Sequence, residues 1–139
     1  MSNGWKDYQN DLRANFDANV SCFDYDLPAG WVKSFVPVMK DELFNLLGPY
    51  AEDFEVLQIK QKWDEIRLYW CFPDRDYYTD EDYDSLNELA LEVNKLIDKY
   101  VDISKKTCVV CGKSATYTTT FGYIAPYCDN CDTKRTIKY

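Results

Sequence analysis

The sequence contains no histidine. This absence removes imidazole from the possible metal ligands, and it excludes Ser-His and Cys-His nucleophile activation and histidine acid–base catalysis. An enzyme built on this chain would depend on carboxylates, Lys, Tyr or Cys. The sequence shows no nucleophile–base pair and no open metal site. We therefore predict that the protein is not an enzyme.

Long hydrophobic runs are also missing, because charged residues interrupt every apolar segment. No segment approaches the ~20 apolar residues that a membrane-spanning helix needs. Residues 1–7 lack the apolar region of a secretory signal peptide, so a reducing compartment is expected. Together these absences predict a soluble, cytoplasmic chain with no membrane partner.

Aromatic and acidic side chains are abundant. Aromatic residues make up 17% and hydrophobic residues 46% of the 139-residue chain, which is enough for a packed core and unlike a disordered segment. The formal net charge of −8 is uneven: residues 107–139 carry +2, and residues 1–106 carry −10. Such a chain repels nucleic-acid phosphates unless one of its faces is locally basic.

Four of the six cysteines form two Cys-x-x-Cys pairs that are separated by sixteen residues. Each pair turns two sulfurs toward one point, and this spacing matches a four-thiolate zinc site with the ligands Cys108, Cys111, Cys128 and Cys131. A site closed by four cysteines leaves no position for water, so we expect one structural Zn²⁺. Gly112 follows the first pair, where a tight turn favours a residue without Cβ.

Disulfides are the competing interpretation of these cysteines, because an even count also suits a secreted framework. Iron and iron–sulfur clusters are further alternatives for a four-cysteine site. A redox role would be expected beside a thioredoxin-like βαβ pattern, which the sequence does not show. Cys22 and Cys71 have no histidine to activate them, so we expect inert or buried thiols.

Two stretches of the first fifty residues show helical periodicity. A short amphipathic helix is predicted by the three- and four-residue spacing of Trp5, Tyr8, Leu12 and Phe16. A loop up to Pro28 is expected to follow. From Pro28 the pattern continues to Gly48, with either a kink at Pro37 or a short turn before a second helix that begins there.

Residues 54–72 alternate between apolar and polar positions, which predicts a β-hairpin that turns at Asp64-Glu65. One face is expected to be apolar, carrying Leu57, Ile59, Trp63, Ile66, Leu68, Trp70 and Phe72. The opposite phase places Lys60, Lys62 and Arg67 toward solvent or a partner. The predicted fold is therefore α+β, with helices packed on a small antiparallel hairpin or sheet and a C-terminal four-cysteine zinc ribbon.

Residues 73–84 hold six carboxylates and one Arg. Thr79 is a good N-cap, Asp82 completes a capping box, and acids in the first turn suit the dipole of a helix that runs to Tyr100. Capping does not explain the other acids or the two adjacent tyrosines. We therefore predict a partner-binding face made of Asp74, Asp76, Tyr77, Tyr78, Asp80, Glu81, Asp82 and Asp84, with Tyr83 adding contact area.

The last part of the chain is expected to form a linker over residues 101–106 and then the metal ribbon. Residues 115–121 and 123–127 predict two arms of a hairpin that turns at Gly122, followed by a basic tail over residues 133–139. We therefore predict two parts: an acidic α+β domain, residues 1–103, and a zinc-ribbon appendage, residues 104–139.

The order of these motifs resembles that of a family of small bacteriophage and prophage proteins. The family pattern is an early Gly-Trp helix, a strand pair close to QIKEKFGGLRFY and a terminal ribbon of the form CxxCG…GWI…LCxxC. Its counterparts here are Gly30-Trp31, residues 58–69 and residues 108–131. Asp64-Glu65 replaces the family's Gly-Gly turn, which argues against a tight two-residue loop because these residues resist positive φ.

The resemblance implies a phage origin and a workplace in the host cytoplasm. Some small acidic phage proteins of this general kind, including a zinc-binding anti-CRISPR type directed at Cas9, disable bacterial immunity. We therefore expect an inhibitor that binds a basic defence effector such as Cas9 and blocks nucleic-acid loading by charge complementarity. The alternative is a zinc-ribbon module that binds nucleic acid or regulates transcription through Lys113, Lys134, Arg135 and Lys138.

Overall fold

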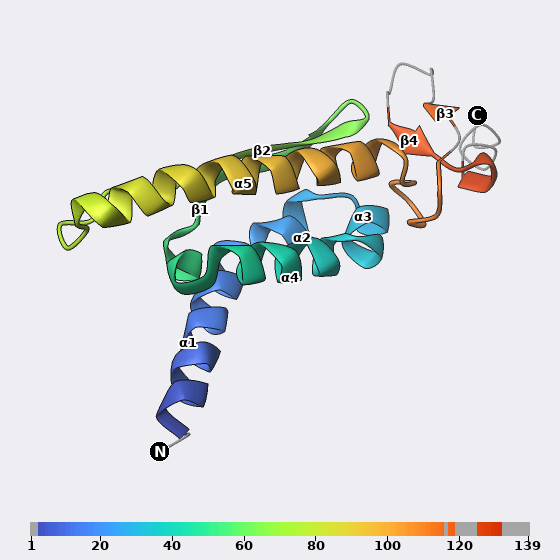
Figure 1. The fold of residues 1–139 in the computed structure, drawn as a ribbon. Coiled ribbons are helices and arrows are strands. Elements are labelled where there is room, and N and C mark those ends of the chain that lie inside the picture. Colours follow the sequence, from blue (N-terminus) through green and yellow to red (C-terminus); the bar gives the residue numbers. More distant parts are fainter. Residues whose placement is uncertain (1–2, 116, 119–124, 132–139) are drawn as a thin grey trace.

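The structure is a computed structural model that describes residues 3–115, 117–118 and 125–131, and it has the predicted α+β architecture. A two-stranded hairpin lies along the longest helix, some of the shorter helices lie beside that helix, and the first helix extends away from it (Figure 1). In chain order the elements are α1 (Asn3–Asn19), α2 (Cys22–Asp26), α3 (Ala29–Ser34), α4 (Val36–Leu47), the 3₁₀ helix η1 (Gly48–Asp53), β1 (Glu55–Lys62), β2 (Glu65–Cys71), α5 (Asp80–Lys105), β3 (Tyr117–Thr118) and β4 (Pro126–Tyr127).

The first helix confirms the predicted amphipathic pattern in part, since Leu12 and Phe16 are buried but Tyr8 is 47% exposed. The loop expected before Pro28 is wrong, because α2 occupies much of it. The reason is visible in the burial: Val20 and Phe23 are both completely buried. Their three-residue spacing continues the apolar stripe beyond the end of α1.

Pro37 lies in the first turn of α4, so the second of the two predicted alternatives is confirmed. A proline is tolerated there because its missing N–H would have no partner within the helix. Gly48 ends α4 with a φ of 55°. Residues with a Cβ rarely adopt this left-handed conformation.

The hairpin loop consists of Trp63 and Asp64, because Lys62 pairs with Glu65. The expectation against a tight two-residue loop is therefore wrong, and the predicted turn is displaced by one residue. Trp63 itself takes the left-handed conformation, with a φ of 59°. The Gln61 side-chain amide donates a hydrogen bond to the Trp63 carbonyl at 2.9 Å, which stabilises the turn.

The two faces of the hairpin differ as predicted, with two exceptions. Ile59 and Ile66 are buried on the apolar face. Leu57 and Trp63, expected on that face, are exposed because Leu57 lies at an irregularity in the register and Trp63 lies in the turn. Lys60, Lys62 and Arg67 occupy the opposite phase.

Helix α5 packs on β2 and α4 and presents one apolar stripe to the core, with Leu86, Val93, Ile97 and Tyr100 buried. It continues to Lys105, so the linker predicted over residues 101–106 is wrong. Ser104 is completely buried there, and its hydroxyl accepts a hydrogen bond from the Ile66 N–H at 3.2 Å. No helix within the described residues is long and apolar enough to cross a membrane.

Candidate metal centre and acidic surface

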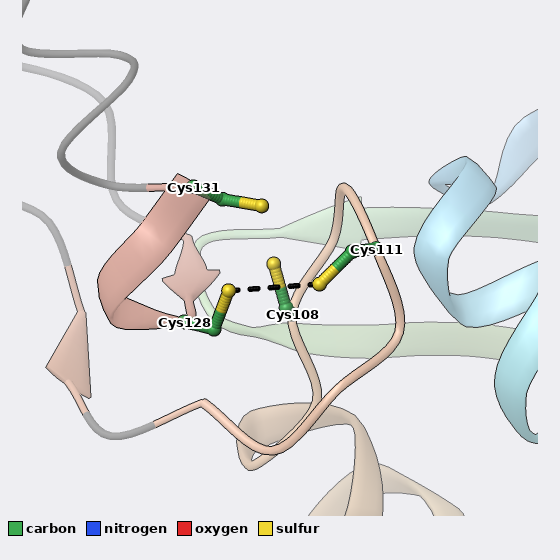
Figure 2. A group of neighbouring side chains, drawn as sticks. All are labelled: Cys108, Cys111, Cys128 and Cys131. Carbon is green, nitrogen blue, oxygen red and sulfur yellow. Dashed lines mark hydrogen bonds between the residues drawn. The ribbon is translucent and has the colours of Figure 1, made fainter.

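The four cysteines predicted as metal ligands converge beyond the C-terminal end of α5. Figure 2 shows their sulfurs directed toward a common centre, and all four Sγ atoms lie within 4.8 Å of one another. The Sγ atoms of Cys111 and Cys128 are 3.5 Å apart. A tetrahedral ion with metal–sulfur bonds of about 2.3 Å would set its sulfurs about 3.8 Å apart. The cluster therefore fits one metal ion, and the predicted ligand set lies in one place.

The surroundings of the cluster shift the pKa values of two of its thiols in opposite directions. Burial acts to raise the pKa of the Cys108 thiol, but hydrogen bonds from backbone N–H groups outweigh it and lower that pKa to about 6. Burial, together with hydrogen bonds to the neighbouring thiols, raises the pKa of Cys131 to about 12. A bound cation would favour the thiolate form of every ligand, so metal binding and deprotonation are coupled here.

The backbone of the first Cys-x-x-Cys pair forms a closed knuckle. The Cys108 N–H donates to the Lys113 carbonyl at 2.7 Å, and the Gly112 N–H donates to the Cys108 carbonyl at 3.0 Å. Gly112 has a φ of 81°. This conformation confirms that a glycine is needed directly after the first pair.

The knuckle is attached to α3 by two hydrogen bonds and by a close backbone contact. The Gly30 N–H donates to the Val109 carbonyl at 2.8 Å, and the Trp31 indole Nε1–H donates to the Thr107 carbonyl at 2.9 Å. A Cβ at Gly30 would lie 2.2 Å from the Cys108 carbonyl oxygen, so only glycine fits there. The Gly-Trp motif is visible in the sequence. Its contact with the cysteine-bearing segments, residues 107–115 and 125–131, which we call the metal loop, is not.

The metal loop and the helices share one hydrophobic core. Val109, Ala125 and Tyr127 belong to the same buried cluster as Trp31 and Phe35. The division of the chain into residues 1–103 and 104–139 stays a prediction, because contacts of this kind do not test whether the two parts fold separately.

The predicted partner-binding residues lie around the opposite end of α5, which begins at Asp80. Five carboxylates are exposed there, and within the described ranges none of them forms an ion pair with Lys or Arg: Asp74, Asp76, Asp80, Glu81 and Asp84. We call this set, with Tyr77, Tyr78 and Tyr83, the acidic surface. Its charges are available to a partner.

Asp82 differs from the other acids because it stabilises the start of α5. The Thr79 N–H donates to Asp82 Oδ2 at 2.9 Å, and the Asp82 N–H donates to Thr79 Oγ1 at 3.1 Å, which confirms the capping box. The Tyr50 hydroxyl donates to Asp82 Oδ1 at 3.1 Å. The Thr79 N–H, followed by the Tyr50 hydroxyl, lowers the pKa of Asp82.

Three tyrosine rings form a chain on the acidic surface. Tyr77 and Tyr78 have ring centroids 5.1 Å apart, and Tyr78 and Tyr83 have centroids 5.6 Å apart, both in edge-to-face geometry. Tyr77 is 68% exposed, whereas Tyr78 is half-buried. Burial, assisted by Asp53, raises the pKa of the Tyr78 hydroxyl, which therefore stays protonated.

The remaining predicted features have mixed outcomes. Cys22 and Cys71 are half-buried free thiols, and burial raises the pKa of both, as expected for inert cysteines. Pairing of β3 with β4 agrees with the predicted arms of the C-terminal hairpin. Lys113 is exposed. The turn at Gly122 and the basic tail with Lys134, Arg135 and Lys138 lie outside the described residues.

Comparisons of the chain with protein-family models, with curated proteins and with solved structures find no match. Inference of function therefore rests on the metal cluster and the acidic surface.

Proposed function

We propose that this protein is a phage-encoded inhibitor of a bacterial defence effector, of the anti-CRISPR type, and that it binds Cas9 in the host cytoplasm and blocks nucleic-acid loading. The observation that carries this proposal is the set of five exposed carboxylates without ion-pair partners in the described chain. Cas9-type effectors hold a heteroduplex in a positively charged channel. A surface of this kind competes with nucleic-acid phosphates for the same Lys and Arg side chains.

The acidic surface combines charge with aromatic contact area. Complementary charges steer two proteins together and fix their register, while tyrosine is enriched among the few residues that dominate the binding energy of protein interfaces. Tyr77 and Tyr83 are 68% and 39% exposed, so both offer area that binding would bury. Their hydroxyls can hydrogen-bond at the edge of such a contact.

In this proposal the metal is Zn²⁺, and its role is structural. Four thiolates are typical of structural zinc because they fill every coordination position. The ion would be held by Cys108, Cys111, Cys128 and Cys131, and it would fix the last part of the chain against α3. Binding and occlusion require no chemistry, so the proposed inhibitor is not an enzyme.

The test is DNA cleavage by a purified Cas9–guide complex with increasing amounts of the protein. The wild type is expected to inhibit, and Asp80→Asn/Glu81→Gln/Asp84→Asn to require a roughly tenfold higher concentration, because three complementary charges are lost. The matched control, Asp7→Asn/Asp11→Asn/Asp98→Asn, removes three exposed acids from other places and should inhibit like the wild type.

Two results would contradict the proposal. Undiminished cleavage at large molar excess of the wild type removes Cas9 as the target, and equal losses in both triple variants remove the acidic surface as the contact. Raising the ionic strength should also weaken inhibition, since exposed charges are screened by salt. Salt-sensitive DNA binding by the isolated protein in a gel-shift assay would instead support the nucleic-acid-binding alternative.

A further inference from the structure

A cavity of about 310 Å³ opens between the end of β2 and the first turns of α5, beside the acidic surface. Four aromatic side chains take part in its lining: Trp70, Phe72, Tyr78 and Tyr83. Asp74 is the one charged residue among the described residues that line it. The cavity is therefore aromatic, and its single charge is negative.

The aromatic walls consist of two edge-to-face pairs. The ring centroids of Trp70 and Phe72 are 5.0 Å apart with planes at 82°, and those of Tyr78 and Tyr83 are 5.6 Å apart with planes at 86°. The Trp70 indole Nε1–H donates to Asn94 Oδ1 at 3.1 Å, which fixes the orientation of its ring. A ligand would therefore meet rings that are already positioned.

We propose that this cavity receives an arginine side chain of the partner protein, an inference that rests on the proposed function and names the chemistry of its contact. A cation is attracted to aromatic faces within about 6 Å of the ring centroid. A guanidinium is planar, stacks on such rings and can pair with the Asp74 carboxylate through two parallel hydrogen bonds.

The charge of the lining selects among the alternatives. At about 310 Å³ the cavity lies at the lower limit of the range of about 300–1,000 Å³ that pockets for small molecules span, so a large cofactor does not fit. An anionic ligand would be repelled by Asp74 and by the neighbouring carboxylates of the acidic surface. A lysine ammonium is more strongly hydrated and cannot stack, so it gains less from the same walls.

The experiment titrates ¹⁵N-labelled protein with three short peptides that alternate glycine with arginine, lysine or citrulline. The arginine peptide should give saturable shifts at the Trp70 indole N–H and at the amides of Phe72 and Asn87. Lysine should bind more weakly, and citrulline, which keeps the shape but lacks the charge, should not bind. Equal binding of citrulline and arginine, or shifts confined to other regions, would overturn the assignment.

Variants separate the cavity from the general negative charge of the protein. Tyr83→Ser and Asp74→Asn should each weaken binding of the arginine peptide about three- to tenfold, whereas Tyr83→Phe keeps the ring and should bind like the wild type. The matched controls are Tyr25→Ser, which removes a tyrosine that is 83% exposed on α2, and Asp98→Asn on α5. An effect of the controls equal to that of the cavity variants would contradict the proposal.

This test and the Cas9 assay fail independently. Arginine peptide in the cavity without inhibition of Cas9 supports the cavity assignment and removes Cas9 as the target. Inhibition of Cas9 without peptide binding overturns the cavity assignment and leaves the rest of the acidic surface as the contact.

Discussion

The two ends of α5 differ in whether the polar groups around them have partners within the chain. Its 26 residues span ~39 Å at about 1.5 Å per residue. Beyond the C-terminal end, the described part of the metal loop is held within the chain by backbone hydrogen bonds and by close packing on Gly30. Around the N-terminal end, five carboxylates have no ion-pair partner in the described chain. The comparison teaches that the groups at one end stabilise the fold, whereas the exposed carboxylates at the other end are free to contact a partner.

Loss of a metal ligand should have the largest effect on stability. It tests whether the metal loop stabilises the fold. Cys108→Ser removes a buried sulfur from the cluster, and structural zinc sites bind with about 10–16 kcal/mol in zinc-finger peptides. We expect loss of the bound metal and a fall of roughly 3 kcal/mol or more in the free energy of unfolding. Elemental analysis and urea unfolding, each with and without a chelator, measure both quantities.

Cys71→Ser is the matched control, because Cys71 is a half-buried thiol outside the cluster. It should keep one metal ion per chain. Full metal content in Cys108→Ser would show that the cluster is not the metal site.

A single methyl group should break the attachment of the metal loop to α3. In Gly30→Ala the new Cβ would lie 2.2 Å from the Cys108 carbonyl oxygen, and a backbone atom cannot rotate away. We expect a cost of about 3 kcal/mol, at the upper end of what overpacking usually causes, together with weaker metal binding. Lys33→Ala, at an exposed position on the same helix, should stay within about 0.5 kcal/mol of the wild type in urea unfolding. Equal stabilities of the two variants would contradict the contact.

A smaller loss of stability is expected from a change in the capping box at the N-terminal end of α5. Thr79→Ala removes the hydroxyl that accepts the Asp82 N–H, and loss of such a cap costs about 1 kcal/mol. Thr79→Ser keeps the oxygen and should retain most of the stability. Metal content should be unchanged in both variants, since the two ends do not share ligands. Loss of metal from Thr79→Ala would show that the ends are coupled.

The smallest expected effect is a pH dependence of the stability, which arises at Glu42 on α4, a residue that contacts the chain's longest helix, α5. Hydrogen bonds from the Tyr100 hydroxyl and then from Lys99 lower the pKa of Glu42 below its usual value of 4.5. The contribution of Glu42 is therefore complete above that value and is lost as the pH falls through the lowered pKa. The stability difference between the wild type and Glu42→Gln should shrink on acidification, measured by urea unfolding from pH 6 to pH 3. A difference that stays constant across that range would contradict this origin.

Local patterns in the sequence predicted much of the fold. The Cys-x-x-Cys pairs, the capping box at Thr79 and the two-face hairpin are all recognised from short repeated spacings in the sequence, and the structure confirms them. The errors lie where burial outweighs local preference. Helix α2 forms because Phe23 is buried, and α5 runs through the expected linker because Ser104 is buried against β2.

The attachment of the metal loop to α3 could not be predicted. Its hydrogen bond from Trp31 to Thr107 joins residues 76 positions apart. A Gly-Trp pair has no local feature that distinguishes a contact with a distant loop from ordinary helix packing. The aromatic cavity beside the acidic surface was missed for the same reason, since Trp70 and Tyr83 meet only after β2 and α5 pack together.

This long-range hydrogen bond also affects how the protein is made. Helix α3 is synthesised well before Thr107 and Val109, so the Gly30–Trp31 surface lacks these two hydrogen-bond partners until most of the chain has been made. Val109, Ala125 and Tyr127 then join the core. A chain that ends before residue 107 would leave the fully buried Trp31 indole without the carbonyl to which it donates.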